Sequence, residues 1–588
     1  MKRLILTAIL TTFLGLSVQV IGSSFHAATN GKSSGNGSIE NPWDLKTALK
    51  KSTIKPGDTL WIHPGTYLGV YKSTLNGNAN APIIVKAISD FEVILDGNVT
   101  SNDAVFSIEG TFVWYIGLTI TNSNPNRIEG MPNLSTRDGV YFIGANNKLI
   151  NCIIHNNGGC GIGFWKPAIN AEIYGCIVYH NGYRGTTRGH GHGIYLQNQT
   201  GTKLITDNIF FNSFGIGIHA YSEGYENKGF KIEGNTFFNS GLPGADFLER
   251  HIIAGGLKPV DDVVVNENYF YNKPNYASKA GVQFGYSSAN SKAEFTNNYV
   301  VESSFYNIKN WNSVTFTGNS MVSSTKQMQL IAFDSFFNIN NPNFNNNQYY
   351  KGNLGLLTFQ EWKNATNQDG SSTYSSSVPT STTYFIRKNQ FEAGRANLIV
   401  YNWGNQKNVD IDFSEVLSVG YEYEIYDVSC LSCGPISFGI YDGSPISVSM
   451  ELTDIELPNG QLPNLNEFVH TAPLFGVFII KCLNLADNSQ STEIETNTPD
   501  LDFQLLNIEN IYPNPVVNNM TVSINSHETS IVEMNIVDLM GRTVYSENIF
   551  INRGLNEHQC NLSSLKQGVY VVNISNGSNK TSAKITKI

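Results

Sequence analysis

A degenerate repeat between about residues 115 and 325 constrains the fold of this chain more than any other feature. Each copy places an Asn or Cys before two to four apolar residues and then returns to Asn or Ser. The copies are NCIIHN (151–156), GCIV (175–178), DNIFFN (207–212), GNTFFN (234–239), ENYF (267–270), NNYV (297–300) and GNSM (318–321). Their marker residues are 24, 32, 27, 33, 30 and 21 residues apart. A period of this length, with short strands between Gly and Asn turns, predicts a β-solenoid.

A second family of short strands accompanies the first. Its members are DGVYF (138–142), CGIGF (160–164), HGIYL (192–196), FGIGI (214–218) and AGVQF (280–284). Two or three strands per coil, repeated, predict stacked parallel sheets. Stacking places Ile153, Val178, Phe210 and Phe237 in one inward column, where each buried side chain contributes roughly 1.5–3 kcal/mol.

The marker residues themselves suggest a polar ladder inside the solenoid. An inward Asn at each turn can hydrogen-bond to the same turn of the next coil, which leaves no buried amide unsatisfied. The predicted ladder consists of Asn208, Asn235, Asn268, Asn298 and Asn319. Cys152 and Cys176 occupy its first positions, where we expect small buried thiols.

The opening of the repeat region resembles a known superfamily. Residues 40–51 (ENPWDLKTALKK) predict a short helix that caps the open end, and KPGDTLWIHPGTY (55–67), APIIVKA (81–87) and FEVILDG (91–97) follow it. This opening resembles right-handed β-helix proteins of the pectate-lyase-like and chondroitinase-B-like superfamily, over roughly residues 28–378. The resemblance implies an all-β fold with a right-handed parallel β-helix and suggests a polysaccharide substrate.

The rest of the chain predicts further modules. Residues 1–27 read as a secretory signal peptide, with Met1-Lys2-Arg3 before an apolar run to Ile21. A Ser/Thr-rich linker (369–383) leads to alternating strands in 384–484, a β-sandwich accessory domain that either binds glycan or is a structural companion. Its Cys430 and Cys433 predict a short disulfide bond rather than a zinc site. Polar, acidic residues 485–504 predict a flexible linker.

The C-terminal module, residues 505–588, carries IYPNPVVNNMTV (511–522), VEMNIVDLMGRTVYSE (532–547) and LKQGVYVVNI (565–574). These segments resemble the C-terminal sorting domain of the type IX secretion system of Bacteroidetes. The resemblance implies a small β-sandwich recognised by that secretion machinery. We therefore expect export across both membranes, followed by release or attachment to the cell surface, and no catalysis in this module.

Charge narrows the choice of partners. The net charge is -10 and only 15% of residues are charged, so the chain lacks the clustered Lys and Arg that neutralise nucleic-acid phosphates. We expect a monomer that acts on polysaccharide and binds no nucleic acid.

The candidate site lies between residues 137 and 251, where the longest loops fall. In IGIHAYSEG (216–224), His219, Tyr221 and Glu223 alternate and therefore share one face of a strand. RGHGHGIYLQN (188–198) supplies the preceding coil. Outward side chains of both segments predict a carbohydrate groove on one side of the solenoid.

The residues of this groove fit β-elimination of an acidic glycan, which needs a base, an acid and a cation for the sugar carboxylate. His219 or His190 is the candidate base and Tyr221 or Tyr195 the candidate acid. Arg188 joins them, since Arg suits a carboxylate. The candidate substrate-binding residues are Trp165, Lys166, Arg184, Gln197, His192 and Arg250.

Other readings of the same residues remain open. His192 also fits a buried turn residue, as do His155 and His180. His190 and His192 form a candidate metal pair, and Glu223, Glu226 and Asp138 are candidate Ca²⁺ ligands. Glycoside hydrolysis needs two carboxyl groups, and the candidates are Asp138, Glu223, Asp246 and Glu249. The third alternative is a non-catalytic solenoid for glycan binding or adhesion.

Overall fold

The computed structural model describes residues 22–98, 103–244, 249–274, 281–306, 310–332, 339–463, 468–483, 506–526, 530–538, 542–552, 554–576 and 580–588. The chain forms two compact units, residues 1–487 and 488–588. Most of the predicted signal peptide and the whole predicted linker 485–504 lie outside the described residues. No helix among the described residues is long and apolar enough to span a membrane.

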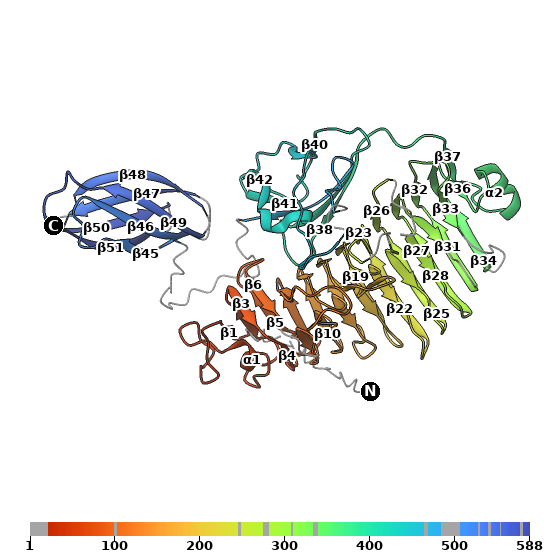
Figure 1. Ribbon diagram of the computed structural model, residues 1–588, viewed down its shortest axis with the longest axis horizontal. Coiled ribbons are helices and arrows are strands. Elements are labelled where there is room, and N and C mark those ends of the chain that lie inside the picture. The colour runs from red at the N-terminus through yellow and green to blue at the C-terminus, as the bar shows by residue number, and fades with distance from the viewer. Residues whose placement is uncertain are drawn as a thin grey trace, which may run out of the picture. The chain divides into compact units, whose positions relative to one another are not determined.

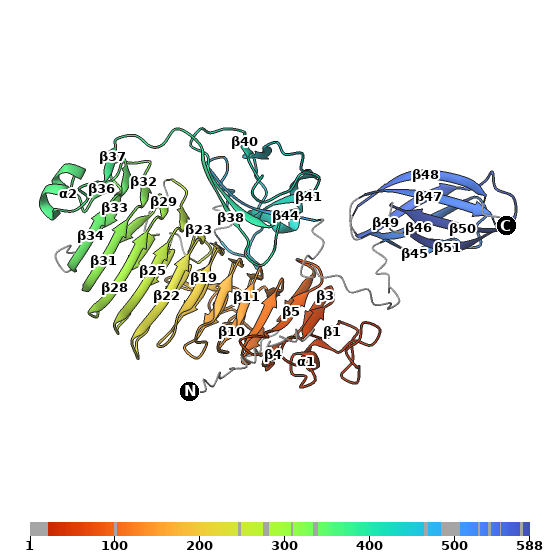
Figure 2. The same ribbon diagram turned by 180° about the vertical axis from the view of Figure 1, so that it is seen from behind.

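The first unit is built on a solenoid of three parallel sheets (Figures 1 and 2). Sheet A contains β1 (Ser24–Ala27), β2 (Thr59–Ile62), β5 (Ile83–Ala87), β8 (Val113–Ile116), β11 (Lys148–Ile150), β14 (Glu172–Tyr174), β19 (Lys203–Thr206), β22 (Asn227–Glu233), β25 (Val260–Asn266), β28 (Asn290–Thr296), β31 (Trp311–Thr317) and β34 (Ile339–Asn345). Sheet B contains β3 (Gly65–Leu68), β6 (Val93–Asp96), β9 (Thr119–Thr121), β12 (Ile153–His155), β15 (Ile177–Tyr179), β20 (Ile209–Phe211), β23 (Thr236–Phe238), β26 (Tyr269–Tyr271), β29 (Tyr299–Val301), β32 (Ser320–Val322), β35 (Gln348–Tyr350) and β37 (Thr373–Ser375).

Sheet C completes the solenoid. It contains β4 (Tyr71–Ser73), β7 (Phe106–Ile108), β10 (Val140–Phe142), β13 (Ile162–Phe164), β18 (Ile194–Leu196), β21 (Ile218–Ala220), β24 (Ile252–Ala254), β27 (Gly281–Phe284), β30 (Ser304–Tyr306), β33 (Gln329–Ala332) and β36 (Asn353–Leu354). Because strands of successive coils pair in register, equivalent inward residues stack into one core. Phe210, for example, stacks on Phe237 with ring centroids 5.0 Å apart. The repeat therefore predicts the coils, and the all-β expectation is confirmed.

The predicted asparagine ladder is present and longer than expected. The side-chain amide of Asn208 donates to Asn235 Oδ1 at 2.9 Å, and the same bond links each ladder residue to the next. Asn347 and then the buried Asp369 extend the ladder. Asp369 therefore ends the ladder, although the sequence places it in a linker.

The residue before each ladder position explains the marker pattern. Asp207 and Gly234 both adopt positive φ, at 56° and 70°. This left-handed conformation favours Gly, Asn and Asp. The turn thus selects the residue types that make the repeat visible in the sequence.

Both ends of the solenoid carry a helix. At the N-terminal end, α1 (Leu45–Ala48) begins where the Asp44 side chain accepts the backbone N–H of Thr47. At the other end, α2 (Phe359–Thr366) buries Trp362, whose indole N–H donates to Asp369 at 2.7 Å. Strand β1 pairs with β2, so Ser24–Ala27 lie in the solenoid although the predicted leader extends to residue 27.

The predicted sandwich region forms two antiparallel sheets. Sheet D contains β38 (Thr383–Lys388), β39 (Ala396–Tyr401), β44 (Phe475–Cys482), β41 (Glu422–Asp427) and β42 (Pro435–Ile440), and sheet E contains β40 (Asn408–Ile411) and β43 (Ile446–Ser449). Alternate residues of sheet D face opposite ways. Leu398 and Phe478 pack toward sheet E. Cys430 and Cys433 form the expected disulfide bond, next to this sheet.

The other face of sheet D packs directly on sheet B, so the sandwich is joined to the solenoid (Figures 1 and 2). Phe475 stacks on Tyr271 with centroids 4.3 Å apart. At the edge of this contact, Arg387 pairs with Asp207 at 2.8 Å and with Glu267 at 2.7 Å. This face of the sandwich is buried and is not available to bind glycan.

The second unit contains β45 (Leu506–Tyr512), β46 (Asn519–Ser526), β47 (Ser530–Asp538), β48 (Thr543–Ile551), β49 (Gly554–Asn561), β50 (Gly568–Ser575) and β51 (Lys580–Lys587). They form a three-stranded and a four-stranded antiparallel sheet. Buried side chains of both sheets, such as Val522 and Ile536, share one core. The fold agrees with the small β-sandwich expected for this module.

Candidate active site

One row of side chains runs along the outward face of sheet C. Paired residues of its first nine strands are in register, in the order Lys72, Ser107, Tyr141, Gly163, Tyr195, His219, Ile253, Gln283 and Tyr306. Their neighbours along each strand, such as Ile194 and Leu196, are fully buried. Alternation along a strand therefore turns the row residues outward.

Aromatic rings form a continuous series along the middle of this row. Successive ring centroids lie 6.2 Å apart for Tyr141 and Trp165, 5.2 Å for Trp165 and Tyr195, 5.0 Å for Tyr195 and His219, and 5.0 Å for His219 and Tyr221. We call these five residues the aromatic row. Residues from four coils of the chain thus meet on one surface, as the candidate groove requires.

Burial determines the protonation of the central pair. Burial, together with the positive charges of Arg188 and Arg250, lowers the pKa of His219 to about 3. Within the described part of the chain, the Nδ1 atom of His219 is buried without a hydrogen-bond partner. Burial also raises the pKa of Tyr195 to about 12. At neutral pH the imidazole is therefore unprotonated and the phenol keeps its proton.

His192 lies beneath this pair and is fixed by the backbone. Its ring is 4.4 Å from that of His219. Its Nδ1 accepts the backbone N–H of Ile216 at 3.0 Å, so the ring proton is on Nε2. Burial holds the pKa of His192 well below its usual value. The geometry agrees with a buried, hydrogen-bonded residue that supports His219.

His190 takes a different position from the one its spacing suggests. It lies in a short hairpin of β16 (Tyr183–Arg184) and β17 (Gly189–His190), outside the three sheets. Its ring stacks on Tyr183 at 4.8 Å. The same hairpin carries Arg184, and its turn carries the exposed Arg188. His190 is therefore not in the row that contains His219.

Two of the expected substrate-binding residues contact the same tyrosine. Lys166 Nζ lies 4.7 Å from the ring centroid of Tyr225, whose hydroxyl donates to Gln197 Oε1. From inside the solenoid, Lys203 donates to the backbone carbonyls of Phe164 at 3.0 Å and Trp165 at 2.6 Å. Sequence reasoning missed Lys203, whose signal is a lysine at the same strand parity as the buried Ile205.

Arg250 lies at the C-terminal end of the row. It pairs with Glu249 at 2.9 Å, and its Nε donates to the Tyr306 hydroxyl. Both Arg250 and Tyr306 line a pocket of about 450 Å³ with Ser304 and Gln329. We call this cavity pocket 2.

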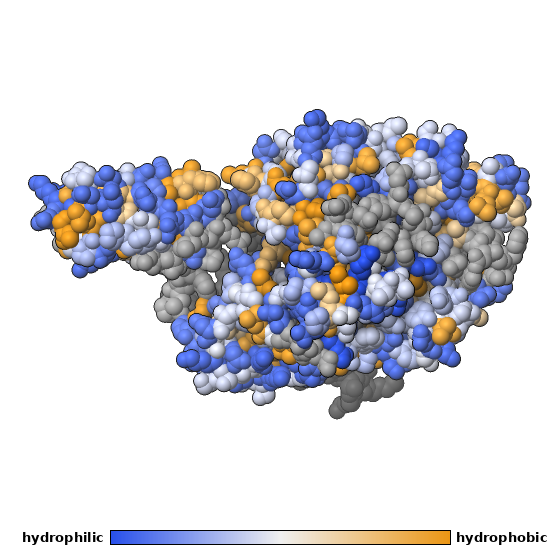
Figure 3. All heavy atoms as spheres, in the orientation of Figure 1, coloured by the Kyte–Doolittle hydropathy of each residue, from blue (hydrophilic) through white to orange (hydrophobic). Residues whose placement is uncertain are grey.

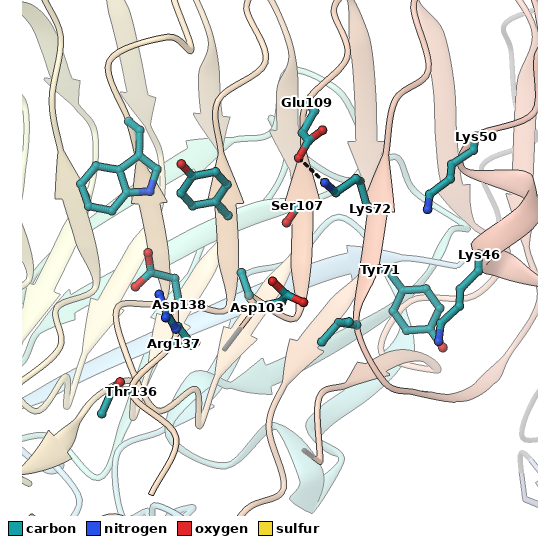
Figure 4. Close-up of a pocket in the computed structure, with 14 residues that line it drawn as sticks. Lys46, Lys50, Tyr71, Lys72, Asp103, Ser107, Glu109, Thr136, Arg137 and Asp138 are labelled. Carbon is teal, nitrogen blue, oxygen red and sulfur yellow. Dashed lines mark ion pairs between the residues drawn. The ribbon is translucent and has the colours of Figure 1, made fainter. Parts of the chain in front are cut away.

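A larger cavity of about 720 Å³, pocket 1, lies at the N-terminal end of the same face (Figure 4). Its lining residues are Lys46, Lys50, Val70, Tyr71, Lys72, Asp103, Ala104, Ser107, Glu109, Thr136, Arg137, Asp138, Tyr141 and Trp165. The Asp138 carboxylate accepts the backbone N–H of Cys160 at 3.0 Å. Burial raises the pKa of Asp138 to about 6.

The remaining predicted ligands are dispersed. Within the described ranges, no three His, Cys, Asp or Glu side chains form a group that could hold a metal ion. Asp138 lies in pocket 1, while Glu226 pairs with Lys228 at 3.3 Å after β21. Glu223 is exposed on the same loop, and Asp246 lies outside the described residues.

His155 and His180 lie away from this face, on the side of sheet B. His155 stacks on Tyr179 at 5.0 Å, and His180 is fully buried. The structure thus separates these two histidines from the candidate site.

Hydrophilic and hydrophobic residues are interspersed over the face drawn in Figure 3.

Two family models match parts of the chain. Residues 25–213 match the model described as Pel9A-like, right handed beta helix region, and residues 510–587 match the Secretion system C-terminal sorting domain. The comparison with curated proteins gave no match. The first model spans the coils that carry pocket 1, Trp165 and Tyr195.

Several solved structures have similar coordinates at low identity. Native GH136 lacto-N-biosidase from Eubacterium ramulus is 13% identical with a TM-score of 0.38, covering 60% of this chain and 68% of that one. An alginate lyase from Paenibacillus sp. str. FPU-7 is 18% identical with a TM-score of 0.34, covering 60% and 99%. The A-module of the Azotobacter vinelandii mannuronan C-5 epimerase AlgE6 is 12% identical with a TM-score of 0.32, covering 55% and 90%. These values are too low to transfer an activity.

The strand pairing and the two family models lead to one conclusion. The sorting domain indicates export, with release or attachment at the cell surface. The first unit is a parallel β-helix whose residues 25–213 match a right-handed β-helix family, and residues 510–587 are a C-terminal sorting domain of the type IX secretion system.

Proposed function

We propose that this protein cleaves an acidic polysaccharide by β-elimination on the outward face of sheet C. The observation that carries the proposal is the contact between Tyr195 and His219, whose ring centroids are 5.0 Å apart. An unprotonated imidazole and a protonated phenol are the two states that a base and an acid need before reaction.

The groups around this pair fit an anionic sugar. Arg188 and Arg250 both act electrostatically on His219, so two cations surround the candidate base. They would hold the sugar carboxylate and stabilise the negative charge that develops on it. A bound carboxylate would in turn raise the pKa of His219 and make it a stronger base.

The proposed reaction moves one proton at each ring. His219 takes the proton from the sugar C5, the C4–O4 bond breaks, and a C4=C5 double bond forms. Tyr195 gives its proton to the departing O4. The two rings are adjacent, so the proton on His219 can return to Tyr195 directly or through water and reset the site.

The length of the aromatic row suits a polymer. Tyr141, Trp165 and Tyr221 extend the surface on both sides of the central pair. Apolar ring faces beside polar edges bind sugars through stacking and hydrogen bonds together. A chain lying along this row would place one glycosidic bond over Tyr195 and His219.

Hydrolysis on the same face is the second candidate. It is favoured by Asp138, a carboxyl that keeps its proton to unusually high pH because it is buried. A raised carboxyl pKa suits the general acid of a glycosidase. Asp103 and Glu109 line the same pocket and would have to supply the second carboxylate.

A screen of the full secreted chain against polysaccharides tests these alternatives. Alginate, polygalacturonate, a glycosaminoglycan and a sulfated galactan would each be incubated with and without added Ca²⁺. Unsaturated ends that absorb in the ultraviolet are the expected result. Reducing ends without that absorbance would indicate hydrolysis instead, and binding without either product would indicate a non-catalytic solenoid.

A further inference from the structure

Pocket 1 has two unlike walls. One is formed by α1 and the residues after it, which cover β4, the edge strand of sheet C. The other is formed by β10 and the turn after β13. Its volume of about 720 Å³ is within the range of sites for small ligands.

The wall beside α1 is cationic. Lys46 and Lys50 are both exposed and line the pocket (Figure 4). Lys46 Nζ lies 5.7 Å from the ring centroid of Tyr71. Among the residues that the structure describes, no carboxylate forms an ion pair with Lys46 or Lys50. Lys72, in contrast, is paired with Glu109 at 2.8 Å.

The opposite wall is aromatic. Tyr141 and Trp165 present their rings there, and among the described residues Trp165 Nε1 is buried without a hydrogen-bond partner. A side chain at Gly163 would collide with this wall, because its Cβ would lie 2.2 Å from Asp138 Oδ2 and 2.4 Å from Trp165 Nε1. The glycine therefore allows the Asp138 carboxylate and the Trp165 indole to pack closely against the strand.

We propose that pocket 1 binds one anionic sugar unit, with its carboxylate or sulfate at Lys46 and Lys50 and its ring against Trp165. This inference rests on the proposed binding of polysaccharide to sheet C. It specifies where the charged group of the sugar binds. It also assigns a binding role to the N-terminal cap, in addition to covering the end of the solenoid.

The cationic wall of pocket 1 is remote from the Tyr195 and His219 pair, although Trp165 contacts Tyr195. Lys46 and Lys50 lie beside β4, which is four strand positions from β18 in sheet C. At the spacing of neighbouring strands this is on the order of 19 Å. Lys46 and Lys50 would therefore strengthen binding without touching the bond that breaks, so their loss raises KM and leaves kcat unchanged.

The test compares two double variants of the full chain. Lys46→Ala with Lys50→Ala removes the two cations of the pocket. Lys231→Ala with Lys292→Ala removes two cations from sheet A and serves as the matched control. Affinity electrophoresis in gels that contain alginate, polygalacturonate, a sulfated galactan or a neutral β-glucan measures binding without requiring turnover.

We expect the wild-type chain and the control to bind an anionic polymer equally. The pocket variant should bind it about tenfold more weakly at low salt, as expected for two exposed ion pairs. Retardation by the uronate gels or by the sulfated gel distinguishes carboxylate from sulfate. Trp165→Ala, which removes the ring that packs against the sugar, should also weaken binding.

The failures can be told apart. If the wild-type chain binds no polysaccharide, the proposed function and this inference both fall. If it binds, and the pocket variant is retarded as strongly as the control, the inference alone is overturned. An equal loss in both variants would mean that only net charge matters, which also overturns it.

Discussion

Tyr195 and His219 are direct partners on neighbouring parallel strands, and their rings meet edge to face at an interplanar angle of 75°. The two residues are separated by a full coil of the chain. In-register stacking brings them together and also provides the unprotonated and protonated groups that the proposed reaction uses. Removing either group should therefore affect turnover far more than binding.

His219→Ala and Tyr195→Phe should each lower kcat by about 10²–10⁴-fold, the usual contribution of one acid or base. KM should change little, because the other residues of the aromatic row and the arginines remain. The measurement is the rate of ultraviolet-absorbing product at saturating substrate. His558→Ala, in the second unit, is the histidine control, and normal turnover by His219→Ala would remove this residue from the mechanism.

Asp138→Asn separates elimination from hydrolysis. It keeps the shape of the side chain and its contact with the Cys160 N–H but cannot transfer a proton. Under the proposed elimination, kcat should stay within a few-fold of the wild-type value. If the wild-type chain releases reducing ends and Asp138→Asn loses all turnover, Asp138 would instead be favoured as the acid of a hydrolase.

The same variant should change how binding depends on pH. Asp138 is neutral below its pKa of about 6 and negative above it, so it repels an anionic sugar only at the higher pH. Wild-type affinity should therefore fall as pH rises from 5 to 7. Affinity electrophoresis at three pH values should show a flatter profile for Asp138→Asn, and parallel profiles would contradict the role of this carboxyl.

Acid should destabilise the solenoid through its buried histidines. Burial lowers the pKa of His251 to about 3 and holds those of His180 and His192 well below normal. Below about pH 6.5 these histidines bind protons in the unfolded chain but stay unprotonated in the folded chain. The free energy of unfolding therefore falls as the pH falls.

Each fully shifted histidine contributes about 1.4 kcal/mol per pH unit in this window. Asp138, Asp207 and Glu302 have the opposite sign, because burial raises their pKa values and so stabilises the folded state as the pH falls. They are outnumbered by the histidines with lowered pKa values, which also include His155 and His219. Thermal denaturation should give a lower midpoint at pH 5 than at pH 7. An unchanged midpoint would contradict the neutral state of these histidines.

The asparagine ladder should carry measurable stability. Asn235→Ala removes the acceptor of Asn208 and leaves the carbonyl of Ile205 without its side-chain donor. Each buried group left unsatisfied costs about 1–3 kcal/mol, and urea denaturation should show a loss of at least that size. Asn341→Ala, at an exposed position of β34, is the control and should change the free energy of unfolding by less than about 0.5 kcal/mol.

The sandwich should be needed for a soluble solenoid. A chain that ends at residue 382 would expose Tyr179, Phe211, Phe238 and Tyr271, which sheet D covers in the intact protein. Large exposed apolar patches promote association, so we expect this chain to aggregate in size-exclusion chromatography. A chain that ends at residue 487 should remain monodisperse. Equal behaviour of the two would mean that the sandwich is a dispensable accessory.

Local sequence determined the architecture. The turns before Asn208 and Asn235 require left-handed backbone, and side chains in the strands between turns alternate between the two faces. The repeat therefore predicts both the coil length and the inward face. The sorting-domain landmarks are also contiguous in sequence. These features depend on neighbouring residues, which is why the sequence alone predicts them.

The candidate site depends on contacts between side chains that belong to different coils. Equal spacing suggested that His190 and His192 point the same way, yet an extra hairpin removes His190 from sheet C. Burial of Asp138 above Gly163, and the position of Lys46 beside the same pocket, arise from side chains that meet only when coils and cap are stacked. Loop length and stacking decide which groups become neighbours, and the resulting burial decides their charge.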